Sequence, residues 1–176
     1  MSLKRHHRVF PGLLERFGIK PDIFVETGTA AGATSKAVSP LFRQVYTIEL
    51  SPQYWQAAII QFRYTNVIPI FGDSAQMLSQ LIPTIQEPAC FFLDAHFVGG
   101  SKRYPFLATG NPLPLWDELK AIKARAIRDI VIVDDTYDFG QEDIGWKDVT
   151  EQSILHLVQP TDHCIVSRDA LAMLLN

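Results

Sequence analysis

The sequence lacks the features that would place the protein in a membrane or outside the cell. Apolar residues make up 47% of its 176 residues, yet no apolar run reaches the ~20 residues that span a bilayer, and no signal-peptide pattern is found. Cysteine is scarce, because only Cys90 and Cys164 occur, and neither belongs to a CxxC or metal-type spacing. We therefore expect buried, reduced thiols, which are typical of a cytoplasmic protein.

An excess of positive charge is also missing. The net charge is −3 and the pI is about 5.9, which argues against a nucleic-acid backbone as the main partner. The basic run 4–8 is a local exception, and we expect it to be a solvated N-terminal arm. Repeats and low-complexity tracts are absent. The length fits a single domain, residues 1–176, with a full core.

Two phosphate-binding motifs are absent as well. The stretch "FVETGTAAGATS" (24–35) carries Gly28 and Gly32, but Ala30 occupies the place of the second glycine in GxGxxG. That glycine lets the backbone approach a pyrophosphate, which the methyl group of Ala30 would crowd. GxxxxGK[ST] does not occur either. This turn disfavours an NAD-type oxidoreductase and favours a ligand with an adenosyl group but no pyrophosphate.

The remaining sequence alternates apolar strand patterns with helical patterns. Strands are expected at 22–26, 44–50, 66–73, 89–96 and 129–135, helices at 33–42, 53–62, 74–82, 113–127 and 148–158, and a final strand pair at 163–167 and 170–175. Near-continuous apolar strands separated by helices predict an α/β fold with a parallel sheet covered on both faces. Several strands end in an acid, at the edge where open α/β sheets bind ligands.

Five of these segments carry a family resemblance. "VETGTAAGATS", "YTIEL", "IFGDSAQML", "FFLDAH" and "VIVDDT" resemble the successive signature segments of class I S-adenosylmethionine-dependent methyltransferases, in register over roughly residues 20–140. The resemblance implies a three-layer Rossmann-like methyltransferase fold, with a mostly parallel seven-stranded sheet that includes a terminal antiparallel strand pair. It also implies S-adenosylmethionine as the cofactor.

The resemblance assigns roles to residues at the strand ends. Glu26, Gly28 and Gly32 would surround the methionine end of the cofactor, and Glu49 would accept hydrogen bonds from both ribose hydroxyls. Asp73 and Ser74 would contact the adenine, and Asp94 would also bind the cofactor. Each residue has a structural alternative: the glycines can simply make a tight turn, Glu49 can be an ordinary acid beside a helix start, and Asp73 can be a helix N-cap.

Three aspartates suggest a metal site. Asp94, Asp134 and Asp135 end the fourth and fifth strands, where this arrangement resembles the metal-dependent O-methyltransferases of the catechol and macrocin (sugar) types. Converging carboxylates repel one another unless they are neutralised, and oxygen ligands suit Mg²⁺, Ca²⁺ or Mn²⁺ rather than Zn²⁺. The cation would lower the pKa of an acceptor hydroxyl. Alternatively, Asp135 only caps the turn that follows it.

Asp94 and His96 are the candidate catalytic residues. His96 follows Asp94 by two residues and is a candidate general base, although it could equally hydrogen-bond a loop carbonyl. The resemblance to the O-methyltransferases implies methyl transfer to the hydroxyl of a small molecule or a sugar. A non-catalytic protein of the same fold, or a methyltransferase acting on a macromolecule, remain as alternatives.

Two long loops are expected to bind the acceptor, at 97–112 and 136–147. Their donors and aromatic rings would suit a sugar or a phenol, and they are Lys102, Arg103, Tyr104, Tyr137, Phe139 and Trp146. Only about twenty residues precede the first strand. The acceptor is then either large, or a second subunit of a homo-oligomer completes the site.

Overall fold

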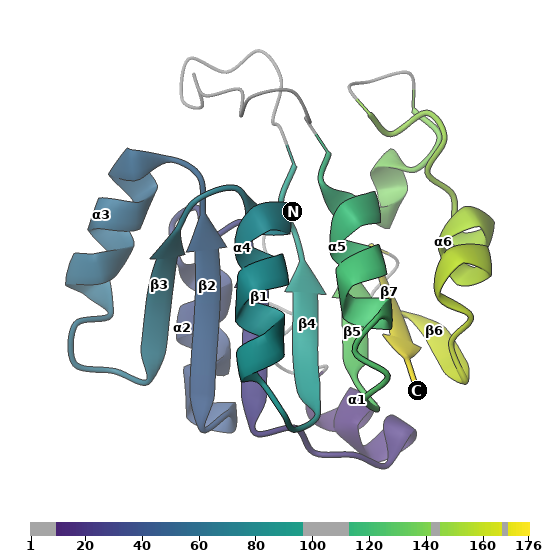
Figure 1. Cartoon of the computed structure of the whole chain (residues 1–176), viewed down its shortest axis with the longest axis horizontal. Coiled ribbons are helices and arrows are strands. Elements are labelled where there is room, and N and C mark those ends of the chain that lie inside the picture. Colours follow the sequence, from purple (N-terminus) through teal and green to yellow (C-terminus); the bar gives the residue numbers. More distant parts are fainter. Residues whose placement is uncertain (1–9, 97–112, 142–144, 167–168) are drawn as a thin grey trace.

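The computed structural model describes residues 10–96, 113–141, 145–166 and 169–176 (Figure 1). The basic run 4–8 and the predicted loop 97–112 lie outside these ranges. The strands are β1 (Ile23–Thr27), β2 (Gln44–Glu49), β3 (Val67–Phe71), β4 (Ala89–Leu93), β5 (Ile130–Val133), β6 (Asp162–Val166) and β7 (Ala170–Leu174). The α-helices are α1 (Phe10–Phe17), α2 (Ala33–Val38), α3 (Pro52–Gln61), α4 (Ser74–Leu81), α5 (Leu115–Lys123) and α6 (Glu151–Val158). Short 3₁₀ turns lie at η2 (Ser39–Leu41), η3 (Ile82–Thr84) and η4 (Thr136–Asp138).

The seven strands form one sheet in the order β3-β2-β1-β4-β5-β7-β6. Strands β1 to β5 pair in parallel, whereas β7 runs antiparallel to both β5 and β6. The carboxyl ends of the parallel strands therefore meet at one edge, which is the upper edge in Figure 1. This topology confirms the predicted Rossmann-like methyltransferase fold, including the antiparallel terminal pair.

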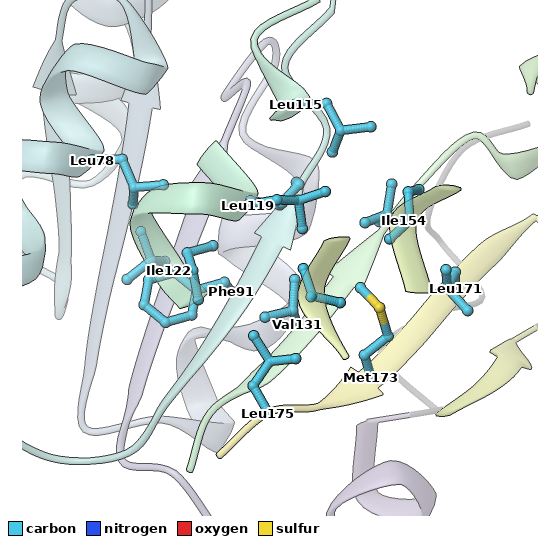
Figure 2. Packing of buried hydrophobic residues seen from close by; sticks show 14 of the residues in the cluster. Leu78, Phe91, Leu115, Leu119, Ile122, Val131, Ile154, Leu171, Met173 and Leu175 are labelled. Atoms are coloured by element: carbon cyan, nitrogen blue, oxygen red, sulfur yellow. The ribbon is translucent and has the colours of Figure 1, made fainter. Parts of the chain in front are cut away.

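The helices cover the sheet on both faces. One apolar cluster packs α4, α5 and α6 against the sheet, and Figure 2 shows part of it, with Leu119 of α5 close to Val131 of β5. The second cluster packs α1, α2 and α3 against the opposite face, where Phe24 contacts the ring of Phe10 at a centroid distance of 5.5 Å. Strands β1, β4 and β5 are consequently buried along their whole length.

The predicted elements all occur, and their ends differ in a consistent way. The strands expected at 66–73, 89–96 and 129–135 end two or three residues earlier, because their polar terminal residues leave the ladder and form the carboxyl edge. The helix expected at 148–158 begins only at Glu151, because Thr150 is its N-cap and forms a capping box with Ser153. Helix α1 was not predicted.

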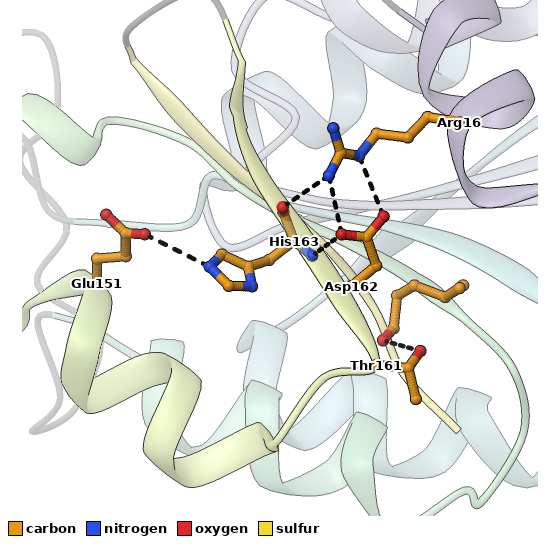
Figure 3. A network of polar contacts seen from close by, with 6 residues as sticks. Arg16, Glu151, Thr161, Asp162 and His163 are labelled. Atoms are coloured by element: carbon orange, nitrogen blue, oxygen red, sulfur yellow. Dashed lines mark hydrogen bonds and ion pairs between the residues drawn. The ribbon is translucent and has the colours of Figure 1, made fainter.

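Arg16 of helix α1 binds to β6, the strand at one edge of the sheet. Arg16 donates to both carboxylate oxygens of Asp162 at 3.1 and 2.8 Å, and to the carbonyl oxygen of His163 at 3.1 Å (Figure 3). The apolar side of the helix, with Phe10, Leu13 and Phe17, is buried. Part of the segment that precedes the first strand thus belongs to the core.

A buried ion pair closes the opposite, amino-terminal edge of the sheet. The side chains of Arg125 and Asp129 are 1% and 0% exposed, with 2.6 Å between Nε and Oδ2. Arg125 also donates to three backbone carbonyls, those of Ile82, Ile85 and Glu87. Asp129 in turn accepts from the backbone N–H of Ala89 at 2.8 Å. This pair joins the loop before β4 to the loop before β5.

Neither cysteine forms a disulfide. Cys90 is buried in β4, where burial raises the pKa of its thiol, and Cys164 is half-buried in β6. Within the described ranges, every helix is too short or too polar to cross a bilayer.

Substitution of Arg125 tests how much its buried ion pair with Asp129 stabilises the amino-terminal edge. Arg125→Met leaves the Asp129 carboxylate buried without its partner, and we expect the free energy of unfolding to fall by about 3–5 kcal/mol. Arg43→Met is the control, because Arg43 pairs with Glu87 on the surface and exposed pairs contribute at most about 1 kcal/mol. Urea denaturation measures both values, and equal losses in the two variants would contradict this stabilising role.

Candidate functional site

Four functional candidates form a row across the carboxyl edge of the sheet. Thr27 of β1 pairs with Ile48 of β2 and Leu93 of β4, and Leu93 pairs with Val133 of β5. The next residue of each strand lies one position beyond this line. Across β2, β1, β4 and β5 these residues are Glu49, Gly28, Asp94 and Asp134. Backbone hydrogen bonds continue into the row, since Gly28 N donates to Ile48 O at 2.9 Å and Asp94 N to Thr27 O at 3.2 Å. The register thus brings the strand-end acids side by side.

The turn after β1 follows a left-handed backbone. Gly28, Ala30 and Gly32 have φ values of 84°, 44° and 71°. A Cβ on Gly28 would lie 2.6 Å from the carbonyl oxygen of Asp94, so the absence of a side chain lets β4 end directly beside the turn. A Cβ on Gly32 would meet the ring of Phe62 at 2.9 Å. Both glycines therefore have a packing reason of their own.

Glu26 is a buried carboxylate held by hydroxyl groups. It is 1% exposed, and its Oε2 accepts from Ser35 Oγ and from Thr47 Oγ1, both at 2.6 Å. Burial is the main cause that raises the pKa of Glu26 to about 7, while the hydroxyl groups of Ser35 and Thr47 oppose the rise. Glu26 thus joins β1 to Ser35 of α2 and Thr47 of β2.

Glu49 fastens the turn to the start of α3. Its Oε2 accepts from the N–H of Ala30 at 2.8 Å, and its Oε1 accepts from the N–H of Ser51 at 2.7 Å. The residue is 8% exposed. Each carboxylate oxygen has two lone pairs, so these backbone contacts leave further acceptor capacity. The carboxylate of Glu49 is consequently fixed in place at the end of β2.

Asp73 and Ser74 start helix α4. Asp73 is its N-cap, because Oδ1 accepts from the N–H of Gln76 at 3.1 Å. Ser74 is buried, and its hydroxyl group helps to lower the pKa of Glu118 against the effect of burial. The structural alternative for Asp73 therefore applies, and one carboxylate oxygen of Asp73 has this capping role.

Asp94, His96 and Asp135 come together beyond the ends of β4 and β5. The Nε2 of His96 lies 2.8 Å from Asp135 Oδ2 and 3.9 Å from Asp94 Oδ1. Each of the three residues offers one atom that can ligate a metal, and these three atoms lie within 4.8 Å of one another. Asp134 is not a member of this group. The chain turns through the left-handed Asp135, with φ of 55°, so the two consecutive carboxylates have different neighbours.

The carboxyl groups of Asp94, Asp134 and Asp135 differ in the direction of their pKa shifts. Burial, followed by the charges of Asp134 and Asp135, raises the pKa of Asp94 well above its usual value. Burial and the charge of Asp135 raise the pKa of Asp134 to about 7. Burial also acts to raise the pKa of Asp135, but hydrogen bonds from His96 and Tyr137 lower it overall. Asp94 and Asp134 thus accept a proton more readily than an ordinary aspartate.

The structure adds Glu118, which sequence reasoning missed. This residue of α5 is 1% exposed, and its Oε2 accepts from Thr27 Oγ1 at 3.4 Å. Burial raises the pKa of Glu118 to about 7. The helical spacing contained the signal, because Glu118 shares its face with Leu115, Leu119 and Ile122, all of which are buried.

Aromatic side chains border this group. His96 contacts the ring of Trp146 edge-on at a centroid distance of 5.6 Å, and Phe139 stacks on Trp146 at 5.8 Å. Trp146 is 6% exposed, whereas Tyr137 is 55% exposed. Of the residues expected to bind the acceptor, Lys102, Arg103 and Tyr104 lie outside the described part of the chain.

The buried carboxylate of Glu26 predicts a pH dependence of stability. A folded pKa of about 7, against an ordinary value of 4.5, means that the folded state binds the proton more tightly. Its contribution is present below about pH 4.5 and is lost as the pH rises through about 7. In Glu26→Gln the amide oxygen still accepts from the hydroxyl groups but does not titrate.

Urea denaturation in EDTA between about pH 4 and 8 measures this effect. Relative to the wild type, Glu26→Gln should gain up to about 3 kcal/mol in unfolding free energy as the pH rises through this range. Glu87→Gln, a surface substitution at the amino-terminal edge, should follow the wild type. A constant difference between Glu26→Gln and the wild type at all pH values would contradict a raised pKa.

No family model and no curated protein sequence matches the chain, but many solved structures do. An S-adenosylmethionine-dependent methyltransferase from Clostridium acetobutylicum ATCC 824 has a TM-score of 0.59 at 12% identity, over 100% of this chain and 92% of that one. An O-methyltransferase from Bacillus cereus in complex with SAH has a TM-score of 0.63 at 15% identity, over 100% and 83%.

The matches also include a protein with a macromolecular substrate. An rRNA methylase from Streptococcus thermophilus has a TM-score of 0.54 at 15% identity, over 100% of this chain and 99% of that one. At identities this low, the structural similarity establishes the fold but does not identify the molecule that accepts a methyl group. The chain therefore has the Rossmann-like fold that S-adenosylmethionine-dependent methyltransferases share.

Proposed function

We propose that the protein is an S-adenosylmethionine-dependent methyltransferase that methylates a hydroxyl group of a small or sugar-bearing molecule. The observation that carries the proposal is Glu49, fixed by two backbone N–H groups at the end of β2 and in one row with Gly28 and Asp94. The fold shared with the neighbours supports it, and so does the SAH bound to the Bacillus cereus protein.

The residues at this edge fit an adenosyl ligand. The Glu49 carboxylate has lone pairs left for a vicinal diol, which offers two hydroxyl donors. Gly28 contributes no side chain where the turn meets Asp94. The methyl group of Ala30 remains an obstacle to a pyrophosphate, as the sequence indicates. When bound, S-adenosylmethionine would supply a methyl group on a sulfonium, which is already a good electrophile.

The groups that would handle the acceptor proton lie at the other end of the row. A hydroxyl group is a poor nucleophile at neutral pH, so a nearby base assists it. The raised pKa of Asp94 brings this carboxylate closer to the range in which a general base works. His96 is the second candidate, and the Asp135 carboxylate at 2.8 Å orients its ring and stabilises its charged form.

The same residues offer a site for a divalent cation. Asp94, His96 and Asp135 provide two carboxylate oxygens and one imidazole nitrogen. This set differs from the all-oxygen set of Asp94, Asp134 and Asp135 expected from the sequence. A mixed set fits Mn²⁺ better than Mg²⁺, since imidazole is not a preferred ligand of Mg²⁺. A cation held here would lower the pKa of the acceptor hydroxyl and orient it.

Isothermal titration calorimetry tests the cofactor. The wild type should bind S-adenosylmethionine and its demethylated product, and it should bind NAD more weakly. Glu49→Gln replaces one acceptor oxygen by a donor and removes the charge, so affinity for both adenosyl ligands should fall about ten- to hundredfold. Glu87→Gln, at the opposite edge of the sheet, is the control. Tighter binding of NAD than of either adenosyl ligand would contradict the proposal.

Thermal unfolding tests the cation. Because an ion that binds only the folded state stabilises it by mass action, Mn²⁺ should raise the melting temperature more than Mg²⁺, and EDTA should reverse the rise. Asp135→Asn should remove most of this gain, whereas Asp22→Asn at the amino-terminal edge should keep it. A melting temperature indifferent to Mn²⁺ and EDTA would leave Asp94 and His96 as a metal-free base.

A further inference from the structure

A small, partly open pocket lies between the ends of β4 and β5 and the start of α5. Its polar wall consists of Asp94, His96, Glu118 and Asp134, and Trp146 provides an aromatic wall. Leucine and valine side chains, among them Leu115 and Val133, complete it. The interior has room for about one water-sized group. This pocket is continuous with the row, because Asp94 belongs to both.

One atom in this wall lacks a hydrogen bond. The Oε1 of Glu118 is buried and forms no hydrogen bond of normal geometry with the described residues, although the hydroxyl group of Ser74 is near enough to this carboxyl group to lower its pKa. The other oxygen, Oε2, is already used by Thr27 at 3.4 Å, and the same Thr27 hydroxyl accepts from the N–H of Asp94 at 3.3 Å. Leaving a buried acceptor unpaired is destabilising. A donor in the pocket would remove this cost.

The side chains that line the pocket indicate which kind of hydrogen-bond donor fits it. Three carboxylates in a space this small favour a positive charge, and the face of a tryptophan also attracts a cation. A bare metal ion would need about six oxygen ligands, but much of this wall is apolar. A guanidinium group exceeds the space of one water molecule. A primary ammonium group fits it and brings three N–H donors.

We propose that this pocket binds a primary ammonium group of the acceptor, so that the methylated hydroxyl belongs to an amino alcohol such as an amino sugar. This inference rests on the proposed function, because it deepens the identity of that acceptor. The ammonium group is a recognition handle, since a protonated amine has no lone pair with which to attack a methyl group. Glu118 is then a specificity-determining residue.

The test compares a charged probe with its neutral counterpart. Binding of 4-fluorobenzylamine, protonated at neutral pH, and of 4-fluorobenzyl alcohol is followed by fluorine NMR, in EDTA so that no divalent ion competes. The wild type should bind the amine about ten- to hundredfold more tightly than the alcohol, as expected for charged hydrogen bonds. Glu118→Gln should reduce this preference by about five- to tenfold, because one charged hydrogen-bond acceptor becomes neutral while Asp94 and Asp134 remain in the wall.

Asp117→Asn is the matched control, because Asp117 precedes Glu118 on α5 but is exposed and pairs with Lys120. It should keep the full preference for the amine. Equal binding of amine and alcohol by the wild type, or an unchanged preference in a folded Glu118→Gln, would overturn the inference. Calorimetry with S-adenosylhomocysteine on the same samples separates the two proposals: if that ligand binds while the amine shows no preference, only the ammonium pocket fails.

Discussion

The alignment of the parallel strand ends is the constraint on which the site depends. Four strands stop at one line of paired residues, so that Glu49, Gly28, Asp94 and Asp134 become neighbours although they are up to 106 positions apart in the chain. The alignment is possible only because Gly28 has no side chain at the point where Asp94 passes. A single glycine thus determines how closely β1 and β4 can end.

The consequence of this alignment is an unusual concentration of buried acid. Hydroxyl groups stabilise Glu26, and backbone N–H groups hold Glu49. Asp94, Asp134 and Glu118 share a pocket in which His96 is the one basic side chain among the described lining residues. His96 is already paired with the carboxylate of Asp135. Such an arrangement costs stability unless protons or a bound cation neutralise it. The repulsion among these carboxylates is therefore the physical reason to expect a positively charged group beside them.

Much of the fold could be predicted from the sequence, because apolar runs and strand-end acids report directly on a parallel sheet. The row itself could be anticipated from Glu49, Asp94 and Asp134, since each stands at the end of a strand pattern. The divergence of Asp134 and Asp135 could not, because it depends on the left-handed backbone of Asp135, which an aspartate tolerates but does not dictate.

Two further features escaped prediction for different reasons. Glu118 lies on the buried face of α5 by helical spacing, but a charged residue in an amphipathic helix is normally assigned to the solvent side. Helix α1 has only eight residues, and it is stabilised largely by packing and by the contact between Arg16 and Asp162. The buried residues Phe10, Leu13 and Phe17 do follow helical spacing, but the contact between Arg16 and Asp162 leaves no local pattern, because these partners are 146 positions apart.

A crystal structure of the protein grown with S-adenosylhomocysteine tests the central claim most directly. The account predicts density for the ligand at the carboxyl edge, with both ribose hydroxyls donating to Glu49 and the sulfur atom on the side of Asp94 and His96. The Glu49 carboxylate should keep its bonds to the N–H groups of Ala30 and Ser51. A ligand that occupies another surface, or a carboxyl edge that stays empty at saturating ligand, would contradict the account.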